Sequence, residues 1–178
     1  MFKAGKYVVY GNVGVCQIRQ VSPLKFGQKG LYYTLHVVHD PRDNVIYTPV
    51  SSVETGKVMI REMISREEAQ KLLSHLPAEP LEWIPDLRKR NDAYSQLVSS
   101  GKTSEWARVI ACLFQKQKEK MEEQRSLPRR DRELLNLAEK LFYNETAVVL
   151  EEEPESIQKK FLALLESEVL PSPAAKKE

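Results

Sequence analysis

Short apolar runs, separated by turn residues, mark the first third of the chain. Residues 7–10 and 13–21 flank a Gly11-Asn12 break, and residues 31–38 form the clearest run. A turn at residues 40–44 precedes a last run at residues 45–50, in which Pro49 lacks a backbone N–H and marks a strand end or a sheet edge. Such runs are typical of strands joined by hairpins. Residues 1–64 are therefore predicted to form a small, strongly bent sheet or barrel.

The pattern changes to helical spacing after Ile64. Ser65 and Glu68 have the spacing of a capping box, in which each side chain bonds the backbone N–H of the other residue. Apolar residues then recur three and four positions apart, at Ala69, Leu72, Leu73 and Leu76. Because Pro77 and Pro80 stop this pattern, residues 65–80 are predicted to form a helix and a linker.

Four further amphipathic helices are predicted after the linker. The first spans about residues 86–98, and the others begin near residues 103, 131 and 154. Each of the last three has one apolar face, formed by Trp106, Val109, Ile110, Leu113, Phe114 and Met121, by Leu134, Leu135, Ala138, Leu141 and Phe142, and by Ile157, Phe161, Leu164 and Leu165. The predicted fold class is α+β in two domains, with an all-α helical bundle at residues 81–170. Residues 171–178 are predicted to be a disordered tail.

The charge of the chain is unevenly distributed, although the formal net charge is only +2. Residues 1–60 carry seven basic and three acidic side chains, and residues 83–132 carry twelve and seven. The segment from residue 151 onward carries four basic and seven acidic side chains. This distribution favours contact between the middle of the chain and an anionic partner.

No catalytic motif is present in the sequence. It contains no phosphate loop and no GxGxxG, HExxH or GxSxG pattern. His36, His39 and His75 share no helical spacing, and strand residues three apart face opposite ways, so no metal site is expected. We therefore expect no enzymatic activity, no cofactor and no small-molecule ligand.

The location of the protein is predicted from two absences in the sequence. No apolar stretch approaches the ~18 residues of a membrane span, and the N-terminus has no apolar signal-peptide core. Cys16 and Cys112 lie outside any CxxC pair and are expected to be buried, reduced thiols. These features predict a cytoplasmic protein.

Basic side chains gather in three clusters of the predicted helical domain. They are Arg88-Lys89-Arg90, then Lys116, Lys118 and Lys120, and then Arg125, Arg129, Arg130 and Arg132. Cations near helix starts can meet phosphates, which the helix N-terminus also attracts. The clusters are either an ordinary charged surface or part of a nucleic-acid interface.

Trp83 lies outside the apolar stripes, between the proline-rich linker and the first basic cluster. It either packs into the seam between the domains or is an exposed aromatic wedge beside cations, able to insert at a DNA base step. Trp106, in contrast, lies on an apolar stripe and is expected in the core.

Taken in order, these residues resemble the CarD/CdnL family of bacterial transcription regulators, over roughly residues 1–166. The N-terminal resemblance rests on Phe2, Lys3, Gly5, Val8-Val9-Tyr10, Gly14-Val15, Tyr33, Leu35, Ile46 and Pro49-Val50. The C-terminal resemblance rests on Trp83, Arg88-Lys89-Arg90, Ser100-Gly101, Asp131, Leu134-Leu135, Ala138, Phe142 and Glu145. The N-terminal module also occurs in the transcription-repair coupling factor.

The resemblance implies a Tudor-like β domain that binds the RNA polymerase β subunit by strand addition. It also implies a helical domain that contacts promoter DNA near the upstream edge of the bubble, where a tryptophan wedge stabilises the open complex. The residues expected to contact polymerase are Leu24, Lys25, Phe26, Ile46, Tyr47 and Thr48. Those expected to contact DNA are Trp83, Arg88, Lys89, Arg90, Arg129, Arg130 and Arg132.

Two hypotheses for the function follow from the sequence. The first is a monomeric transcription regulator that bridges polymerase and double-stranded promoter DNA, and so associates with the nucleoid through polymerase. The alternative is a protein–protein adaptor with a charged helical domain and no role at DNA. Salt-dependent binding to duplex DNA separates the two.

Overall fold

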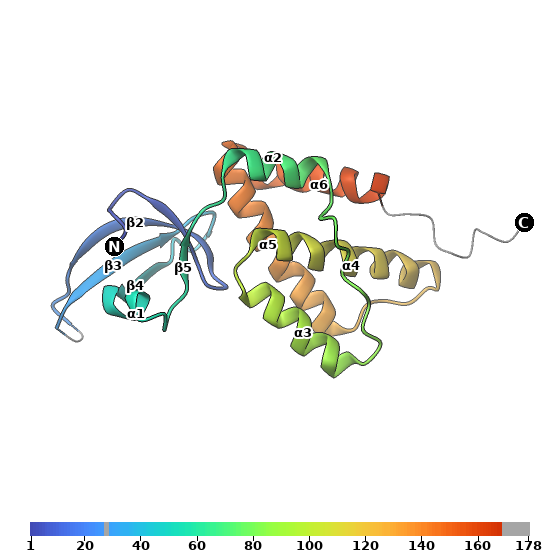
Figure 1. The fold of residues 1–178 in the computed structure, drawn as a ribbon, viewed down its shortest axis with the longest axis horizontal. Coiled ribbons are helices and arrows are strands. Elements are labelled where there is room, and N and C mark those ends of the chain that lie inside the picture. Colours follow the sequence, from blue (N-terminus) through green and yellow to red (C-terminus); the bar gives the residue numbers. More distant parts are fainter. Residues whose placement is uncertain (27–28, 169–178) are drawn as a thin grey trace, which may run out of the picture.

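The computed structural model describes residues 1–26 and 29–168 of the chain. An N-terminal antiparallel sheet and a C-terminal group of helices lie side by side along the molecule (Figure 1), which confirms the predicted two-domain α+β fold. The strands are β1 (Tyr7–Tyr10), β2 (Gly14–Pro23), β3 (Leu31–Val37), β4 (Val45–Pro49) and β5 (Ile60–Glu62). The helices are α1 (Val50–Glu54), α2 (Arg66–Ser74), α3 (Leu87–Ser99), α4 (Thr103–Glu122), α5 (Arg129–Leu150) and α6 (Pro154–Glu168). The predicted tail at 171–178 lies outside the described residues.

The five strands form one sheet in the order β4-β3-β2-β1-β5, with every pair antiparallel. The register of β2 against β3 shifts between Ile18 and Gln20, and such a bulge increases the local twist. β4 ends at Pro49 and lies at one edge of the sheet, as predicted for a residue without a backbone donor.

One face of the sheet carries a small apolar core. Val8, Cys16, Ile18 and Leu35 are fully buried there, because alternate strand residues point to the same face. The short helix α1, which the apolar pattern did not reveal, adds Val50 to this core and contacts β3 and β4.

The predicted capping box begins α2. The Ser65 hydroxyl accepts from the Glu68 N–H at 3.1 Å, and the Glu68 carboxylate accepts from the Ser65 N–H at 2.9 Å. This helix packs against α5 and α6 rather than against the sheet, with Ala69 fully buried. In space, α2 is therefore part of the helical domain.

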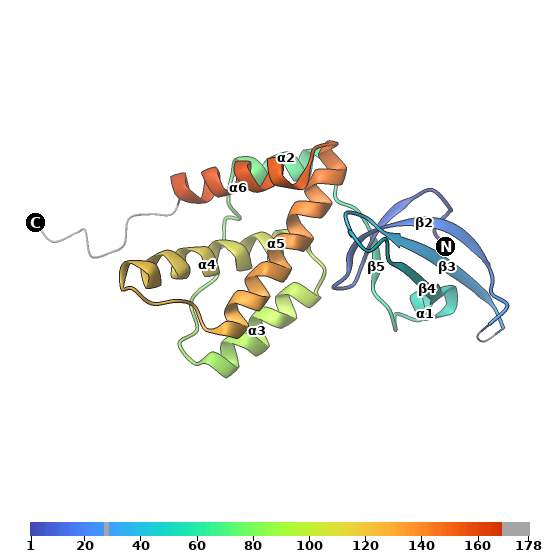
Figure 2. The ribbon, with the colours of Figure 1, turned by 180° about the vertical axis from the view of Figure 1, so that it is seen from behind.

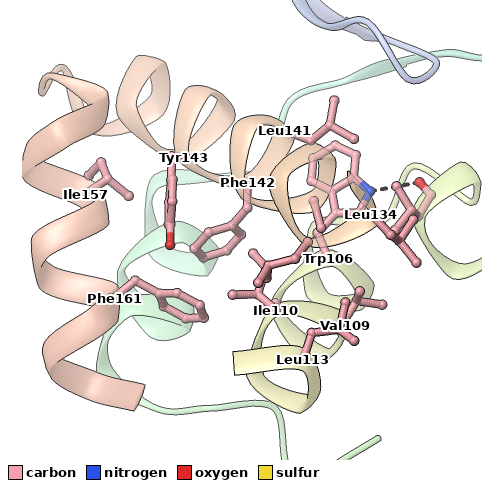
Figure 3. Close-up of a cluster of buried hydrophobic side chains, with 14 of the residues drawn as sticks. Trp106, Val109, Ile110, Leu113, Leu134, Leu141, Phe142, Tyr143, Ile157 and Phe161 are labelled. Atoms are coloured by element: carbon pink, nitrogen blue, oxygen red, sulfur yellow. Dashed lines mark hydrogen bonds between the residues drawn. The ribbon is translucent and has the colours of Figure 1, made fainter. Parts of the chain in front are cut away.

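The helical core is built from the predicted stripes of α4, α5 and α6 (Figure 3), except for Met121 at the end of the α4 stripe, which is 66% exposed. Trp106, Phe142 and Phe161 are fully buried, and the ring centroids of Phe142 and Phe161 lie 4.5 Å apart. The indole N–H of Trp106 donates to the Val98 carbonyl at 2.9 Å, which satisfies its polar atom inside the core. Trp106 is therefore a core residue, as predicted.

The two domains meet where the β1–β2 hairpin and β5 approach α5 (Figure 2). Val9 and Val15 point away from the small sheet core and are buried in the same apolar cluster as the helices. The sheet therefore contributes to both cores, one on each face.

Candidate nucleic-acid interface and sheet edge

The open edge of β4 is the first surface with the chemistry to bind a partner. Within residues 1–26 and 29–168, β4 pairs with β3 alone. Val37 donates its N–H to the Asn44 carbonyl at 3.0 Å, so Val37 and Asn44 are a hydrogen-bonded pair of the β3–β4 ladder. Because hydrogen-bonded pairs alternate in an antiparallel ladder, the even-numbered residues of β4 bond β3. The odd-numbered residues Val45 and Tyr47 direct their main-chain groups to the open edge.

The side chains of β4 divide between the two faces of the sheet. Thr48 is only 2% exposed, and its hydroxyl donates to the Tyr10 hydroxyl at 3.1 Å. Ile46 packs against the sheet core. The expectation that the Thr48 side chain contacts polymerase is therefore corrected, because that side chain is buried. Ile46 points to the same face but is only partly buried, and its contact with polymerase stays a prediction.

An exposed apolar patch flanks this edge. The ring of Phe26 meets that of Tyr47 edge to face, with centroids 5.7 Å apart, and both side chains are exposed. Lys25 is exposed beside them, whereas Leu24 is half-buried. Of the residues predicted from the sequence to contact polymerase, Lys25, Phe26 and Tyr47 have exposed side chains.

A buried ion pair joins the first turns of α3 and α5. The Arg90 guanidinium donates to both carboxylate oxygens of Asp131, at 3.1 and 2.6 Å, and the two residues are 2% and 0% exposed. Arg90 also donates to the Ile84 and Pro85 carbonyls, at 2.6 and 3.1 Å. The expectation that Arg90 contacts DNA is therefore corrected, since its donors are used inside the protein.

The other predicted cations of this region lie on the surface. Arg88 and Lys89 are exposed on the first turn of α3, and Arg129, Arg130 and Arg132 are exposed on the first turn of α5. We call these five residues the basic surface. Because the Arg90–Asp131 pair holds the two helix starts together, the positive ends of both helix dipoles add to these charges.

Trp83 lies against the helical domain beside this surface and is half-buried. The Arg90 guanidinium carbon lies 3.9 Å from its ring centroid, and the Lys116 ammonium lies 5.2 Å away. Its backbone is anchored on the preceding side, where the Tyr94 hydroxyl donates to the Glu82 carbonyl at 2.7 Å. Burial raises the pKa of Tyr94, so this hydroxyl keeps its proton.

The structure adds one apolar residue that the sequence reasoning missed. Leu87, the first residue of α3, is 43% exposed next to Arg88 and Lys89. Its position at the predicted start of the helix and beside two cations was the available signal. Leu87 is a second apolar side chain at the basic surface, besides Trp83.

Neither a metal site nor a membrane span is found in the described part of the chain. Within residues 1–26 and 29–168, no three His, Cys, Asp or Glu side chains are grouped as metal ligands. No helix within the same residues has the length and apolar character needed to cross a bilayer.

Comparison with known proteins identifies the N-terminal domain. A comparison with curated proteins found no match. Residues 2–64 match the family described as the CarD-like/TRCF RID domain. The match covers the whole sheet, including the open edge of β4, and ends one residue before the cap of α2. Residues 2–64 of this chain are therefore similar to the CarD-like/TRCF RID domain, an RNA polymerase-interacting domain.

Proposed function

We propose that this protein is a transcription regulator that binds the RNA polymerase β subunit through the open edge of β4 and binds promoter DNA through the basic surface. By holding both at once, it stabilises the open promoter complex. The observation that carries the proposal is the free strand edge in a domain of the polymerase-interacting family. The supporting observation is the separate basic surface on the helical domain.

Strand addition explains how the edge of β4 binds a partner. An extended segment of the β subunit would pair with the outward main-chain groups of Val45 and Tyr47. The exposed rings of Phe26 and Tyr47 would cover apolar side chains of that segment. Main-chain hydrogen bonds then provide affinity, and the aromatic pair provides specificity.

The basic surface has the chemistry for phosphate contacts. Its five cations sit on two adjoining helix starts, where backbone N–H groups and dipoles also attract anions. Phosphate contacts would position the protein on the duplex without reading its sequence. Trp83 and Leu87 are the two apolar side chains placed to insert at an opened base step.

A single proline substitution in β4 tests the polymerase contact. Tyr47→Pro removes an N–H that points to the open edge, so it should leave the β3 pairing intact and block strand addition. Tyr47→Ala is the matched control, because it removes the same ring but keeps the donor. In pull-downs with the isolated β subunit, we expect Tyr47→Pro to abolish binding and Tyr47→Ala to weaken it. Equal binding by the proline variant and the wild type would exclude this edge as the contact.

Promoter fragments test the DNA contact. With polymerase present, the protein should prolong the lifetime of the open complex on a fragment that carries a preformed bubble. It should also bind duplex DNA alone in a salt-dependent manner. Polymerase binding without either effect would favour the adaptor alternative, in which the basic surface contacts another protein.

A further inference from the structure

One buried carboxylate connects the two domains. Glu145 of α5 has no exposed surface, and it accepts hydrogen bonds from both terminal nitrogens of Arg61 on β5, at 2.6 and 2.8 Å. It also accepts from the Ile64 N–H at 3.0 Å and from the Thr103 hydroxyl at 2.6 Å. Arg61 lies on β5 and Ile64 lies just after it. The hydrogen bonds of Glu145 therefore join the end of the β domain to the helical domain.

Arg61 makes further hydrogen bonds to the helical domain besides those to Glu145. Its Nε donates to the Gly101 carbonyl at 2.5 Å, and one terminal nitrogen donates to the Thr103 hydroxyl at 3.1 Å. Its guanidinium carbon lies 5.3 Å from the ring centroid of the core residue Trp106. Gly101 has a φ of +72°, and a Cβ there would collide with the Met59 side chain. The positive φ favours glycine at this position, in the loop whose carbonyl accepts from Arg61 of β5.

We infer that Glu145 and Arg61 form a latch that fixes the orientation of the polymerase-binding domain relative to the basic surface. The apolar contacts of Val9 and Val15 press the domains together, but apolar burial is not directional. A bidentate arginine–carboxylate pair is directional. A buried pair of this kind adds little net stability compared with apolar residues, so its specific contribution is geometry.

The latch matters for function because the two binding sites act on one assembly. The inference rests on the proposed function in this respect. A rigid bridge presents its second site to DNA at a high effective concentration once the first is bound to polymerase, whereas a loose tether does so less well. Loss of the latch should therefore leave the binding of each domain to its own partner intact and weaken the simultaneous complex.

The test compares two glutamate-to-glutamine variants. Glu145→Gln removes the latch charge. Glu62→Gln is the matched control, because Glu62 is adjacent to Arg61 but forms an exposed pair with Lys6 inside the β domain. Thr103→Val is a milder second variant that removes one hydroxyl from the network, and it serves if Glu145→Gln does not fold. We expect affinities for the isolated β subunit and for duplex DNA to change less than about twofold. The open-complex lifetime should fall at least about tenfold for Glu145→Gln, should fall less for Thr103→Val, and should not change for Glu62→Gln.

A cross-link between the domains tests whether Glu145→Gln acts through the orientation of the two domains. Asn12 and Ser99 face each other across the domain boundary, with their side-chain polar atoms 3.4 Å apart. A short thiol-specific cross-linker between Asn12→Cys and Ser99→Cys should recover the open-complex lifetime of Glu145→Gln. Failure of a confirmed cross-link to do so would overturn the latch.

A direct measurement of orientation keeps this inference independent of the proposed function. Distance distributions between spin labels on exposed Lys3 and Lys159 should broaden in Glu145→Gln and not in Glu62→Gln. Unchanged distributions in Glu145→Gln would overturn the latch. Broadened distributions in a protein that never bridges polymerase and DNA would instead overturn the proposed function and keep the latch.

Discussion

Arg90 and Asp131 lie 41 residues apart in the sequence, yet two hydrogen bonds of 3.1 and 2.6 Å join their side chains in the interior. The pair brings the first turns of α3 and α5 together and places a guanidinium 3.9 Å from the centroid of Trp83. One buried ion pair therefore organises both the basic surface and the aromatic side chain beside it.

Arg90 should behave as a structural residue, unlike its neighbours. Arg90→Ala leaves Asp131 as an uncompensated buried charge, which should lower the free energy of unfolding by about 3–5 kcal/mol. Arg88→Ala changes an exposed side chain and should stay within about 0.5 kcal/mol of the wild type. Denaturant unfolding of the two variants measures the difference. Similar small effects would mean that the Arg90–Asp131 pair is not formed in solution.

If the basic surface contacts DNA phosphates, the salt dependence of DNA binding should change when its cations are removed. Replacing Arg88 and Lys89 by alanine should weaken binding by a similar factor for unrelated duplexes, because phosphate contacts carry no base information. The slope of log affinity against log salt should become shallower by about 0.9 for each phosphate that the variant no longer neutralises. Lys159→Ala, an exposed cation on α6, is the control and should leave the slope unchanged. An unaltered slope in the double variant would remove these two residues from the interface.

Alanine substitutions of Trp83 and Leu87 should have different effects on stability, and they show which side chain inserts into DNA. Trp83→Ala should cost about 1–2 kcal/mol of stability, because the variant lacks the half-buried ring that packs on the Arg90 guanidinium. Leu87→Ala should cost under about 0.5 kcal/mol. The open-complex decay rate at a weak promoter, corrected for the folded fraction, identifies the inserting side chain as the one whose removal accelerates decay. If neither substitution does so, the basic surface acts without a wedge.

The two thiols should resist chemical modification in the folded protein. Burial raises the pKa of Cys16 to about 12, and burial also raises the pKa of Cys112. Since the thiolate is the nucleophile, both thiols should react with iodoacetamide at pH 8 much more slowly than the same thiols in denaturant. Mass spectrometry after timed quenching measures this. Rapid labelling of native Cys16 would show that the sheet core opens readily.

Local patterns were sufficient to predict much of the fold. The capping box at Ser65 and Glu68, the burial of Trp106 and the strand end at Pro49 were all predicted correctly, because each depends on neighbours within a few residues. The short helix α1 was not predicted, because five residues are too few to establish a helical period.

The site was harder to predict, because its key interactions join distant parts of the chain. Arg90 looks like one of three equal cations in sequence, and only folding distinguishes it by placing Asp131 beside it. In the same way, Glu145 and Arg61 are 84 residues apart. Composition and periodicity describe which residues face inward, but they do not describe which inward-facing charges meet.

Gly101 sets a condition on any attempt to recombine these domains. Its φ of +72° favours glycine over residues with a side chain, and its carbonyl accepts from Arg61. A chimera that grafts this sheet onto another helical domain would need a glycine at the same place and a carboxylate to receive Arg61. Without both, each half could fold well and still sit at the wrong angle. The compatibility of the two halves is thus encoded at a few boundary positions, and these are the positions to transplant together.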